Sequence, residues 1–506
     1  MRKILYFIPS VLYAAAIFTV SSIDRPALIK PPFPYFDKAA HFIEFAGFTF
    51  VLFFSITKSF DKINFKKKIF FAVMLSVIYA VTDEIHQSFT IYRKAEILDW
   101  AADAAGSAAS GLMLVLYHKI FPSSVSISVF LLLLALTRDG YGFEKKYFIG
   151  TSMYFAVFLE EKDSIVYKEN NIPKDPFKSV KDNGGNIIRL CINTPPYSNT
   201  LTGAESADWG SYYYVEKSMK RAKQNGLNIF LTFDYASFAF YDKLNPYSVP
   251  PLLNLIAYDT VSLANAIYNY TFENLDSLFR NDLRPAFVSI GNEINWRFLE
   301  PNIPEKELKP FDVNRKLFLI KAGIAAVRGI EKKYNEKIKI VMHIEGLNNL
   351  KWWLKTHSAE KLDFDVMALS FYHGWHKMGE FKNWAEPIKW LKENYGKDFL
   401  LLETAQVWTD KWSDNRLNIL CDENIPETFQ KPPAPLTQKN YMIFLSKDII
   451  GNGGLGVIYW GGDYVGNNCW IYPDKYGRGS SWEDKTFWNF DCNIHDGIQW
   501  MRETYR

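Results

Sequence analysis

Eight short apolar runs alternate with longer amphipathic stretches from residue 146 to the end of this 506-residue chain. Runs of this length bounded by polar residues are typical of buried parallel strands, and strands that alternate with helices build α/β folds. Eight such strands close a (β/α)8, or TIM, barrel. We predict a barrel over residues 146–506, with helices at 214–225, 260–278 and 314–334 and strands at 147–153, 186–192, 227–234, 286–292, 337–344, 364–371, 398–403 and 455–460.

The first 137 residues differ in composition, since they hold one of the 15 tryptophans and consist largely of long apolar segments. About 20 apolar residues cross a bilayer as a helix. We predict an all-α membrane domain of four to five transmembrane helices, with four in residues 1–120 and a short fifth segment and linker in 121–145. The apolar segments are 4–20, 39–57, 69–89, 98–117 and 125–137.

Basic residues predict the orientation of these helices. Arg2 and Lys3 precede the first segment, and five lysines between 58 and 68 flank the connection after the second. Such clusters stay in the cytoplasm. Five crossings would then place the chain from Arg138 onward outside, with the lipid bilayer as a partner. No A-x-A cleavage site follows the first segment, which favours an uncleaved helix.

The formal net charge of +3 is small and forms no basic stripe, so a nucleic-acid partner is not expected. The four cysteines lack CxxC spacing, which argues against a zinc or redox motif. A disulfide between Cys421 and Cys469 and buried free thiols are both compatible with the sequence. The sequence does not determine the oligomeric state.

Polar residues that are unusual for a membrane segment gather at one predicted face of the helices. They are Asp37, His41, Glu44, Asp83, Glu84, His86, Gln87, Arg93, Asp99 and Asp103. Ion pairs between helix ends and a functional site would both explain them. His41, Glu44, Asp83 and His86 could ligate a metal, but their spacing is not diagnostic, so no metal site is predicted.

The segments DKAAHFIEFAGF, YAVTDEIHQSF and RKAEILDWAADAAG that carry these residues resemble the VanZ-like family of small membrane proteins. The resemblance covers about residues 1–120. The family's founding association is with glycopeptide-antibiotic resistance.

Glu293 and Glu403 close the predicted fourth and seventh strands, at the barrel end where catalytic groups lie. Two carboxyl groups about 5 Å apart act as proton donor and nucleophile in a retaining glycosidase. We expect Glu293 to be the general acid/base and Glu403 the nucleophile, because one carboxyl must hold a proton while the other stays ionised.

Other residues at the predicted strand ends could complete a sugar site. Arg189 could keep Glu403 charged, Tyr372 could donate a hydrogen bond to it, and Asn292 could bind the sugar 2-hydroxyl. Trp460 could form the floor of the sugar site. Trp296, Trp375 and Trp408 could line a cleft for a polymer, Asp234 could contact substrate, and for His343 binding and packing are both open.

Eight segments in order resemble glycoside hydrolase family 53, the endo-β-1,4-galactanases, over about residues 147–500: IIRLCINTPP, AKQNGLNIFLTFDYASF, VSIGNEINW, IVMHIEG, FDVMALSFYHGW, LLLETAQVW, GVIYWGGDY and SSWEDKTFWNF. The resemblance implies that Glu293 is the acid/base and Glu403 the nucleophile. It also exposes departures: Asp234 stands where the family has histidine, Ser237 where it has aspartate, and Cys191 replaces a second arginine. Galactan specificity is therefore less secure than catalysis.

Some family members bind calcium in the loop after the seventh strand, predicted here at 408–437. Asp410, Asp414, Asn415 and Asn418 offer oxygens there, but the spacing is not a calcium-loop signature. No organic cofactor is expected.

The leading hypothesis is a membrane-tethered, extracytoplasmic retaining endoglycosidase that hydrolyses β-1,4-galactan or arabinogalactan. A second hypothesis keeps the fold and changes the polysaccharide. A third is a glycan-binding or envelope-resistance protein in which the membrane half carries the function.

Overall fold

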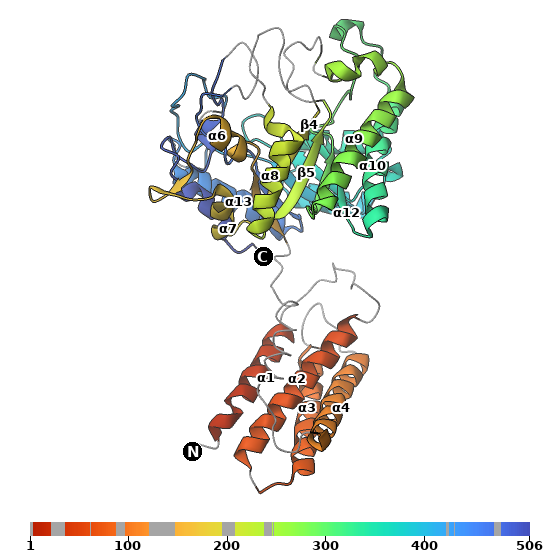
Figure 1. Cartoon of the computed structure of the whole chain (residues 1–506), viewed down its shortest axis with the longest axis vertical. Coiled ribbons are helices and arrows are strands. Elements are labelled where there is room, and N and C mark those ends of the chain that lie inside the picture. Colours follow the sequence, from red (N-terminus) through yellow and green to blue (C-terminus); the bar gives the residue numbers. More distant parts are fainter. Residues whose placement is uncertain are drawn as a thin grey trace. The chain divides into compact units, whose positions relative to one another are not determined.

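The computed structural model describes residues 4–21, 36–60, 62–87, 97–120, 147–194, 208–236, 245, 247–420, 425–429, 431–469 and 477–505. The chain divides into two compact units, Met1–Phe143 and Glu144–Arg506. The first unit is helical and the second contains the barrel (Figure 1).

The described helices of the first unit coincide with the first four apolar segments. They are the short 3-10 helix η1 (Ile4–Phe7) and helices α1 (Ile8–Ser21), α2 (Phe36–Ser59), α3 (Phe65–Gln87) and α4 (Ile97–Ile120). Their apolar core includes Phe45, Phe53, Ile69 and Leu114. Among the described helices, α2 contains one stretch, His41–Ser59, that is long and apolar enough to cross a membrane. The predicted fifth segment lies outside the described residues.

The second unit contains a closed barrel of eight parallel strands, which confirms the predicted fold class. Around the barrel the strand order is β1-β10-β9-β8-β7-β6-β5-β4. All eight predicted strands are present, as β1 (Phe148–Ser152), β4 (Ile187–Asn193), β5 (Asn228–Asp234), β6 (Phe287–Ile290), β7 (Lys339–Glu345), β8 (Val366–Ser370), β9 (Asp398–Glu403) and β10 (Gly456–Tyr459). A small antiparallel pair, β2 (Lys168–Glu169) and β3 (Ile172–Pro173), lies outside the barrel sheet.

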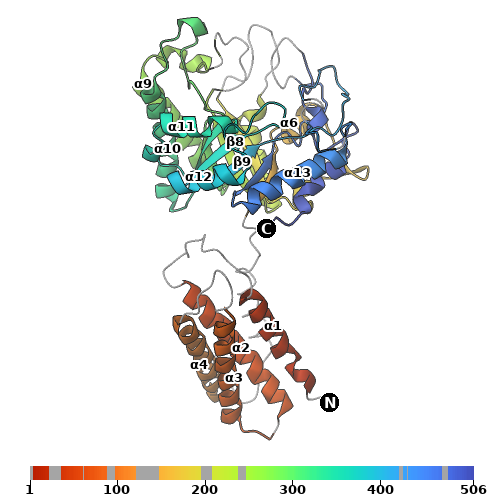
Figure 2. The ribbon, with the colours of Figure 1, turned by 180° about the vertical axis from the view of Figure 1, so that it is seen from behind.

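Helices surround the strands, as both views of the ribbon show (Figure 1 and Figure 2). Asp259 and Asp312 cap the two longest of them by accepting hydrogen bonds from backbone N–H groups of the first turn. The α-helices are α6 (Ala156–Lys162), α7 (Pro176–Asp182), α8 (Tyr212–Gln224), α9 (Thr260–Arg280), α10 (Val313–Tyr334), α11 (Leu350–Thr356), α12 (Ala385–Tyr395) and α13 (Pro435–Gly451). Short 3-10 helices are η2 (Asp208–Gly210), η3 (Pro251–Ile256), η4 (Glu305–Glu307), η5 (Leu347–Asn349), η6 (Ala359–Lys361), η8 (Glu483–Lys485) and η9 (Asp496–Arg502).

Apolar side chains fill the barrel interior near the amino-terminal ends of the strands, and polar side chains follow towards the carboxyl-terminal ends. Ile187, Phe230, Phe287 and Leu400 belong to one buried cluster. A second and larger cluster packs the outer faces of the strands against the helices. Since the strands are buried on both faces, their sequences are nearly continuous apolar runs.

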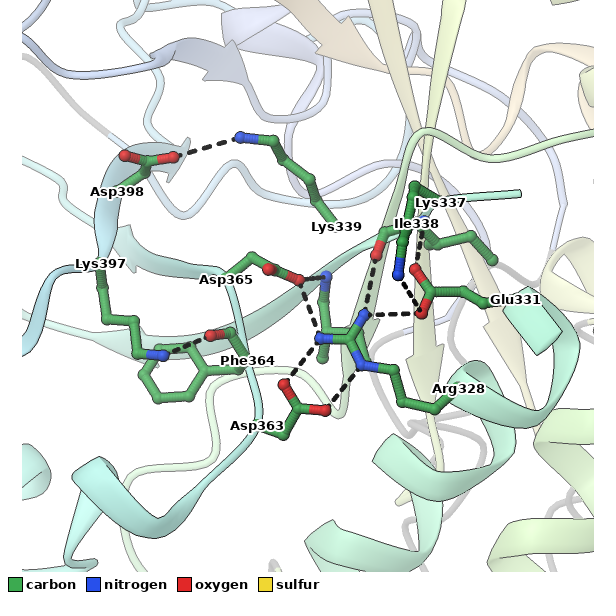
Figure 3. A network of polar contacts seen from close by, with 11 residues as sticks. Arg328, Glu331, Lys337, Ile338, Lys339, Asp363, Phe364, Asp365, Lys397 and Asp398 are labelled. Atoms are coloured by element: carbon green, nitrogen blue, oxygen red, sulfur yellow. Dashed lines mark hydrogen bonds and ion pairs between the residues drawn. The ribbon is translucent and has the colours of Figure 1, made fainter. Parts of the chain in front are cut away.

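A network of charged residues connects the amino-terminal ends of β7, β8 and β9 (Figure 3). Arg328 on α10 binds Asp363 through two hydrogen bonds of 2.7 and 2.9 Å and reaches Asp365 at 3.3 Å. Asp365 in turn accepts the Ile340 N–H at 2.8 Å. Arg328 therefore ties α10 to the starts of β7 and β8, at the barrel end associated with stability.

Candidate active site

The two glutamates reach the mouth of the barrel by different backbone routes. Glu403 is the last residue of β9, where a register shift pairs it with Ser370. Glu293 was expected to close the fourth strand directly, but β6 ends at Ile290. Gly291 (φ 84°) and Glu293 (φ 47°) are both left-handed, so a turn rather than the strand aims the Glu293 side chain. Non-glycine residues in this region carry strain of about 1–3 kcal/mol, which is common at active sites.

The carboxylates converge within one small volume. One oxygen of Glu293, one of Glu403 and one ring nitrogen of His343 all lie within 4.8 Å of one another. Carboxyl separations of about 5–5.5 Å accompany retaining glycosidases, and about 6.5–9.5 Å inverting ones. The nearest oxygens of the pair thus lie closer together than the separation that accompanies inverting glycosidases.

Glu403 lies beside a cation and one further donor. Arg189, fully buried on β4, forms an ion pair with Glu403 Oε1. The other guanidinium nitrogens donate to Thr232 Oγ1 at 3.0 Å and Asn292 Oδ1 at 2.7 Å, so the arginine is fixed on three sides. Tyr372 donates to Glu403 Oε2 at 3.4 Å. A guanidinium and a phenol O–H therefore both donate to the Glu403 carboxyl group.

Glu293 has the opposite environment. Its pKa is raised to about 8, chiefly by burial and then by the negative charges of Glu403 and Glu345. A carboxyl group in such a place holds its proton at neutral pH and can donate it. One pocket thus contains an acid and a carboxylate.

His343 lies close to both glutamates and contacts polar residues at or just after the ends of neighbouring strands. Burial lowers its pKa well below the usual range, so the imidazole is neutral. Its Nε2 is 2.9 Å from Ser370 Oγ, and its Nδ1 is 3.1 Å from Asn292 Oδ1. The Glu293 backbone nitrogen lies 3.4 Å from the same Nδ1, which accepts from that N–H only in the tautomer that does not donate to Asn292. Because both ring nitrogens have hydrogen-bond partners, the arrangement favours a positioning role over metal ligation.

Aromatic rings form a connected wall next to the carboxylates. Trp460, the first residue after β10, meets Trp482 edge to face at 5.1 Å, and Trp482 meets Trp375 at 6.1 Å. Trp375 also contacts Tyr372 at 5.2 Å. Trp375 remains 46 % exposed and Trp460 is half-buried. Exposed ring faces of this kind suit the apolar C–H faces of a sugar chain.

Two other tryptophans from the sequence prediction lie in different surroundings. Trp296, which is exposed, packs on Trp352. The Trp408 indole N–H donates to the Glu483 carbonyl at 3.0 Å, and its ring contacts Phe490 and His495. Trp408 therefore anchors the C-terminal segment.

Asp234, the last residue of β5, is 4 % exposed, and its Oδ1 accepts the Ala236 N–H at 3.2 Å. Cys191 is buried close to it on β4. Ser237 and Cys421 lie outside the described residues, so the Cys421–Cys469 disulfide stays a prediction.

Four residues at the site had no assigned role in the sequence. Ser370 and Glu345 end strands β8 and β7, a position that could have singled them out. Trp482 and Lys485 come from the SSWEDKTFWNF segment, whose place beside Trp460 only the fold shows. Lys485 is fully buried, and its Nζ lies 3.2 Å from the centroid of the Trp460 ring.

The loop after β9 contains side-chain oxygens that could bind calcium, but some of them already accept hydrogen bonds from the protein. Asp414 accepts hydrogen bonds from the backbone N–H groups of Arg416 and Ser480 at 2.8 and 2.6 Å. Asp410 and Asn415 are exposed, and the Asn418 side-chain amide donates to the Lys411 carbonyl. Calcium binding in this loop stays a prediction.

In the helical unit, the structure brings His41, Glu84, Asp99 and Asp103 together. Asp83 is buried and Glu44 is half-buried on the same helices. Arg93 and the side chains of Asp37, His86 and Gln87 lie outside what the structure describes.

Comparison with known proteins agrees with this geometry. The family described as Glycosyl hydrolase family 53 matches residues 148–501. The chain belongs to glycosyl hydrolase family 53. It is therefore a glycoside hydrolase, and the resemblance found in the sequence is confirmed. The VanZ/LLP1 family matches residues 1–120, which confirms the second resemblance.

Relatives of this family 53 chain include an arabinogalactan endo-β-1,4-galactanase of Cellvibrio japonicus, 29% identical over 363 residues that cover 71% of this chain and 91% of the relative. An endo-β-1,4-galactanase of Bacillus subtilis is 25% identical over 331 residues, covering 63% and 70%. The solved family 53 catalytic domain of Ignisphaera aggregans has a TM-score of 0.61 at 24% identity, covering 72% of this chain and 98% of that domain. A solved fungal β-1,4-galactanase has a TM-score of 0.53 at 20% identity, covering 70% and 99%. Both structures share the barrel fold.

Proposed function

We propose that the barrel is a retaining endo-glycosidase that hydrolyses β-1,4-galactan or arabinogalactan by double displacement. The observation that carries this proposal is the pair of carboxylates whose oxygens approach within 4.8 Å, one held as an acid and the other ion-paired with Arg189. The galactanase relatives supply the substrate class.

Each residue then has a defined task. Glu403 attacks the anomeric carbon while Glu293 gives its proton to the leaving glycosidic oxygen, and a glycosyl-enzyme ester forms. Glu293, now ionised, takes a proton from water, which attacks the same carbon and releases Glu403. Arg189 and Tyr372 orient Glu403, and Asn292 is placed by Arg189 where it can contact the 2-hydroxyl of the sugar. No metal ion or organic cofactor enters these steps.

Substitution of the two glutamates tests the assignment. We expect Glu293→Ala and Glu403→Ala each to lower the hydrolysis of galactan at least about 100-fold, because each variant lacks one reacting group. With an activated aryl β-galactoside, azide should rescue Glu293→Ala to a β-glycosyl azide and Glu403→Ala to an α-glycosyl azide. Products of the opposite configuration would reverse the roles, and full activity of either variant would exclude the mechanism.

A second candidate keeps the mechanism and changes the polysaccharide. It is favoured by the buried carboxyl of Asp234 and the thiol of Cys191, which replace the residues expected from the family pattern beside the sugar site. Release of reducing sugar from galactan, arabinogalactan, mannan and glucan by the purified protein decides between the two. Inertness towards galactan with turnover of another polymer would favour the second candidate, and binding without any turnover would favour a glycan-binding protein.

The helical unit supports a membrane anchor. Its outer surface exposes large apolar side chains such as Leu12, Phe70 and Leu112, whereas serines face one another inside, with Ser76 Oγ and Ser107 Oγ at 2.9 Å. An apolar exterior with small polar residues between helices is typical of helices packed in lipid. We infer that these helices hold the barrel at the cell membrane, with the barrel on the extracytoplasmic side.

A further inference from the structure

A close helix crossing in the first unit sets up a second polar site. A Cβ atom on Gly106 would lie 2.0 Å from the Phe42 carbonyl oxygen, so only glycine allows α4 to approach α2 this closely. His41 directly precedes Phe42, and Asp103 lies one helical turn before Gly106. The crossing therefore presses His41 against the Asp103 face of α4.

Asp103 orients the imidazole of His41. His41 Nδ1 lies 2.9 Å from Asp103 Oδ1, and the Asp103 side chain is fully buried. Its second oxygen, Oδ2, finds no hydrogen-bond partner among the described residues. With Nδ1 turned to Asp103, His41 Nε2 faces Asp99, whose Oδ1 is 3.9 Å away. A carboxylate that holds one ring nitrogen while the other faces further carboxylates is the usual arrangement around a metal-binding histidine.

Two carboxylates complete the site from neighbouring helices. One oxygen of Glu84 on α3, one of Asp99 on α4 and one nitrogen of His41 on α2 lie within 4.8 Å of one another. Glu84 and Asp99 are each 8% exposed. The nearest described cation is Lys38, whose Nζ is 2.5 Å from Asp99 Oδ1.

Four carboxyl groups, those of Asp83, Glu84, Asp99 and Asp103, are buried among the described helices. Lys38 and His41 are the described basic residues that contact Asp99 and Asp103. Buried carboxylates are stable only when they are neutralised or coordinate a cation.

We propose that His41, Glu84 and Asp99 bind one divalent transition-metal ion, Zn²⁺ or Mn²⁺, with Asp103 as a positioning residue behind His41. One imidazole nitrogen and two carboxylate oxygens suit these ions better than Ca²⁺ or Mg²⁺, which take oxygen ligands. Three protein ligands leave a coordination position open for an exogenous oxygen donor.

The test uses the full-length protein in detergent. After incubation with ZnCl2 or MnCl2 and desalting, we expect elemental analysis to find about one Zn²⁺ or Mn²⁺ per chain, and MgCl2 or CaCl2 to leave less than a tenth of that. His41→Ala and Asp99→Asn should each lower the metal content at least about tenfold. In the wild type, Co²⁺ should give a visible d–d absorption that both variants lose.

The matched control is Glu403→Gln, which removes a carboxylate from the other histidine–carboxylate cluster and should leave the metal content unchanged. Unchanged gel-filtration profiles would show that the two helical-unit variants are folded, and unchanged galactan hydrolysis would show that the barrel is intact. Lys38→Met separates metal binding from a simple ion-pair network: loss of the competing ammonium should tighten Zn²⁺ binding at least about fivefold. A wild-type protein without bound metal, or metal lost only in Glu403→Gln, would overturn the proposal.

Discussion

At the scale of single residues, Glu293 and Glu403 are chemically identical and differ only in their surroundings. Burial and the neighbouring carboxylates raise the pKa of Glu293 to about 8. In the proposed mechanism the protonated form is the active acid, so kcat/KM for galactan should fall about tenfold per pH unit above this pKa. A pH profile measured at low substrate concentration checks this.

Glu345 provides the control for this interpretation. Its negative charge is one of the groups that raise the pKa of Glu293. Glu345→Gln should therefore move the alkaline limb of the profile to lower pH, because less repulsion opposes ionisation of Glu293. If the alkaline limb of the pH profile did not move in this variant, the limb would report the ionisation of a group other than Glu293.

Lys485 is a second residue whose surroundings matter more than its type. Burial lowers its pKa well below the usual range, and its Nζ finds no hydrogen-bond partner among the described residues. The amine instead lies against the rings of Trp460 and Trp482, at 3.2 and 4.0 Å from their centroids. Burying an amine in this way costs stability, so the position favours a functional role.

Lys485→Met should therefore raise the melting temperature by a few degrees, since an apolar side chain of similar length replaces an unsatisfied polar one. We expect the same variant to raise KM for galactan, because the amine fixes the Trp460 ring at the sugar site. Calorimetry and steady-state kinetics measure the two effects. A lower melting temperature with unchanged KM would make Lys485 a purely structural residue.

At the scale of elements, α10 is fastened to β7 and β8 at the end of the barrel away from the glutamates. Arg328→Ala removes two hydrogen bonds to Asp363 and one each to Asp365, Glu331 and the Ile338 carbonyl. We expect it to lower the free energy of unfolding by about 1–2 kcal/mol, since Asp363 is largely exposed and solvent weakens that pair. KM and kcat should stay at wild-type values.

Lys337→Ala is the matched control within the same network (Figure 3). Lys337 is 93% exposed and lies 3.7 Å from Glu331, so its loss should leave the unfolding free energy nearly unchanged. Denaturant titrations of both variants make the comparison. Equal destabilisation would mean that the hydrogen bonds of Arg328 do not hold α10 in place.

At the scale of the whole molecule, the location of the barrel depends on how many helices cross the membrane. Four crossings from a cytoplasmic N-terminus would return the chain to the cytoplasm, and a fifth at 125–137 would take the barrel outside. We expect alkaline phosphatase to be active when fused after residue 146 and inactive when fused after residue 120. Activity at both positions, or at neither, would contradict a fifth crossing between them.

Much of the barrel could be predicted from the sequence because its signals are local. The eight strands are continuous apolar runs, and the ends of α9 and α10 are marked by aspartates that cap the first turn. Glu403 follows directly from such a run. Glu293 was placed less accurately, because a left-handed turn after β6 has no apolar pattern of its own.

The sequence alone determined the fold class, the eight strands and the family, since apolar periodicity and ordered segments persist without knowledge of contacts. Only the tertiary structure decided the chemistry within the site. Three features depend on residues far apart in the chain: the raised pKa of Glu293, the ion pair between Arg189 and Glu403, and the contact of Lys485 with the Trp460 ring. Burial and charge proximity are properties of the folded chain, and they set which carboxyl keeps its proton.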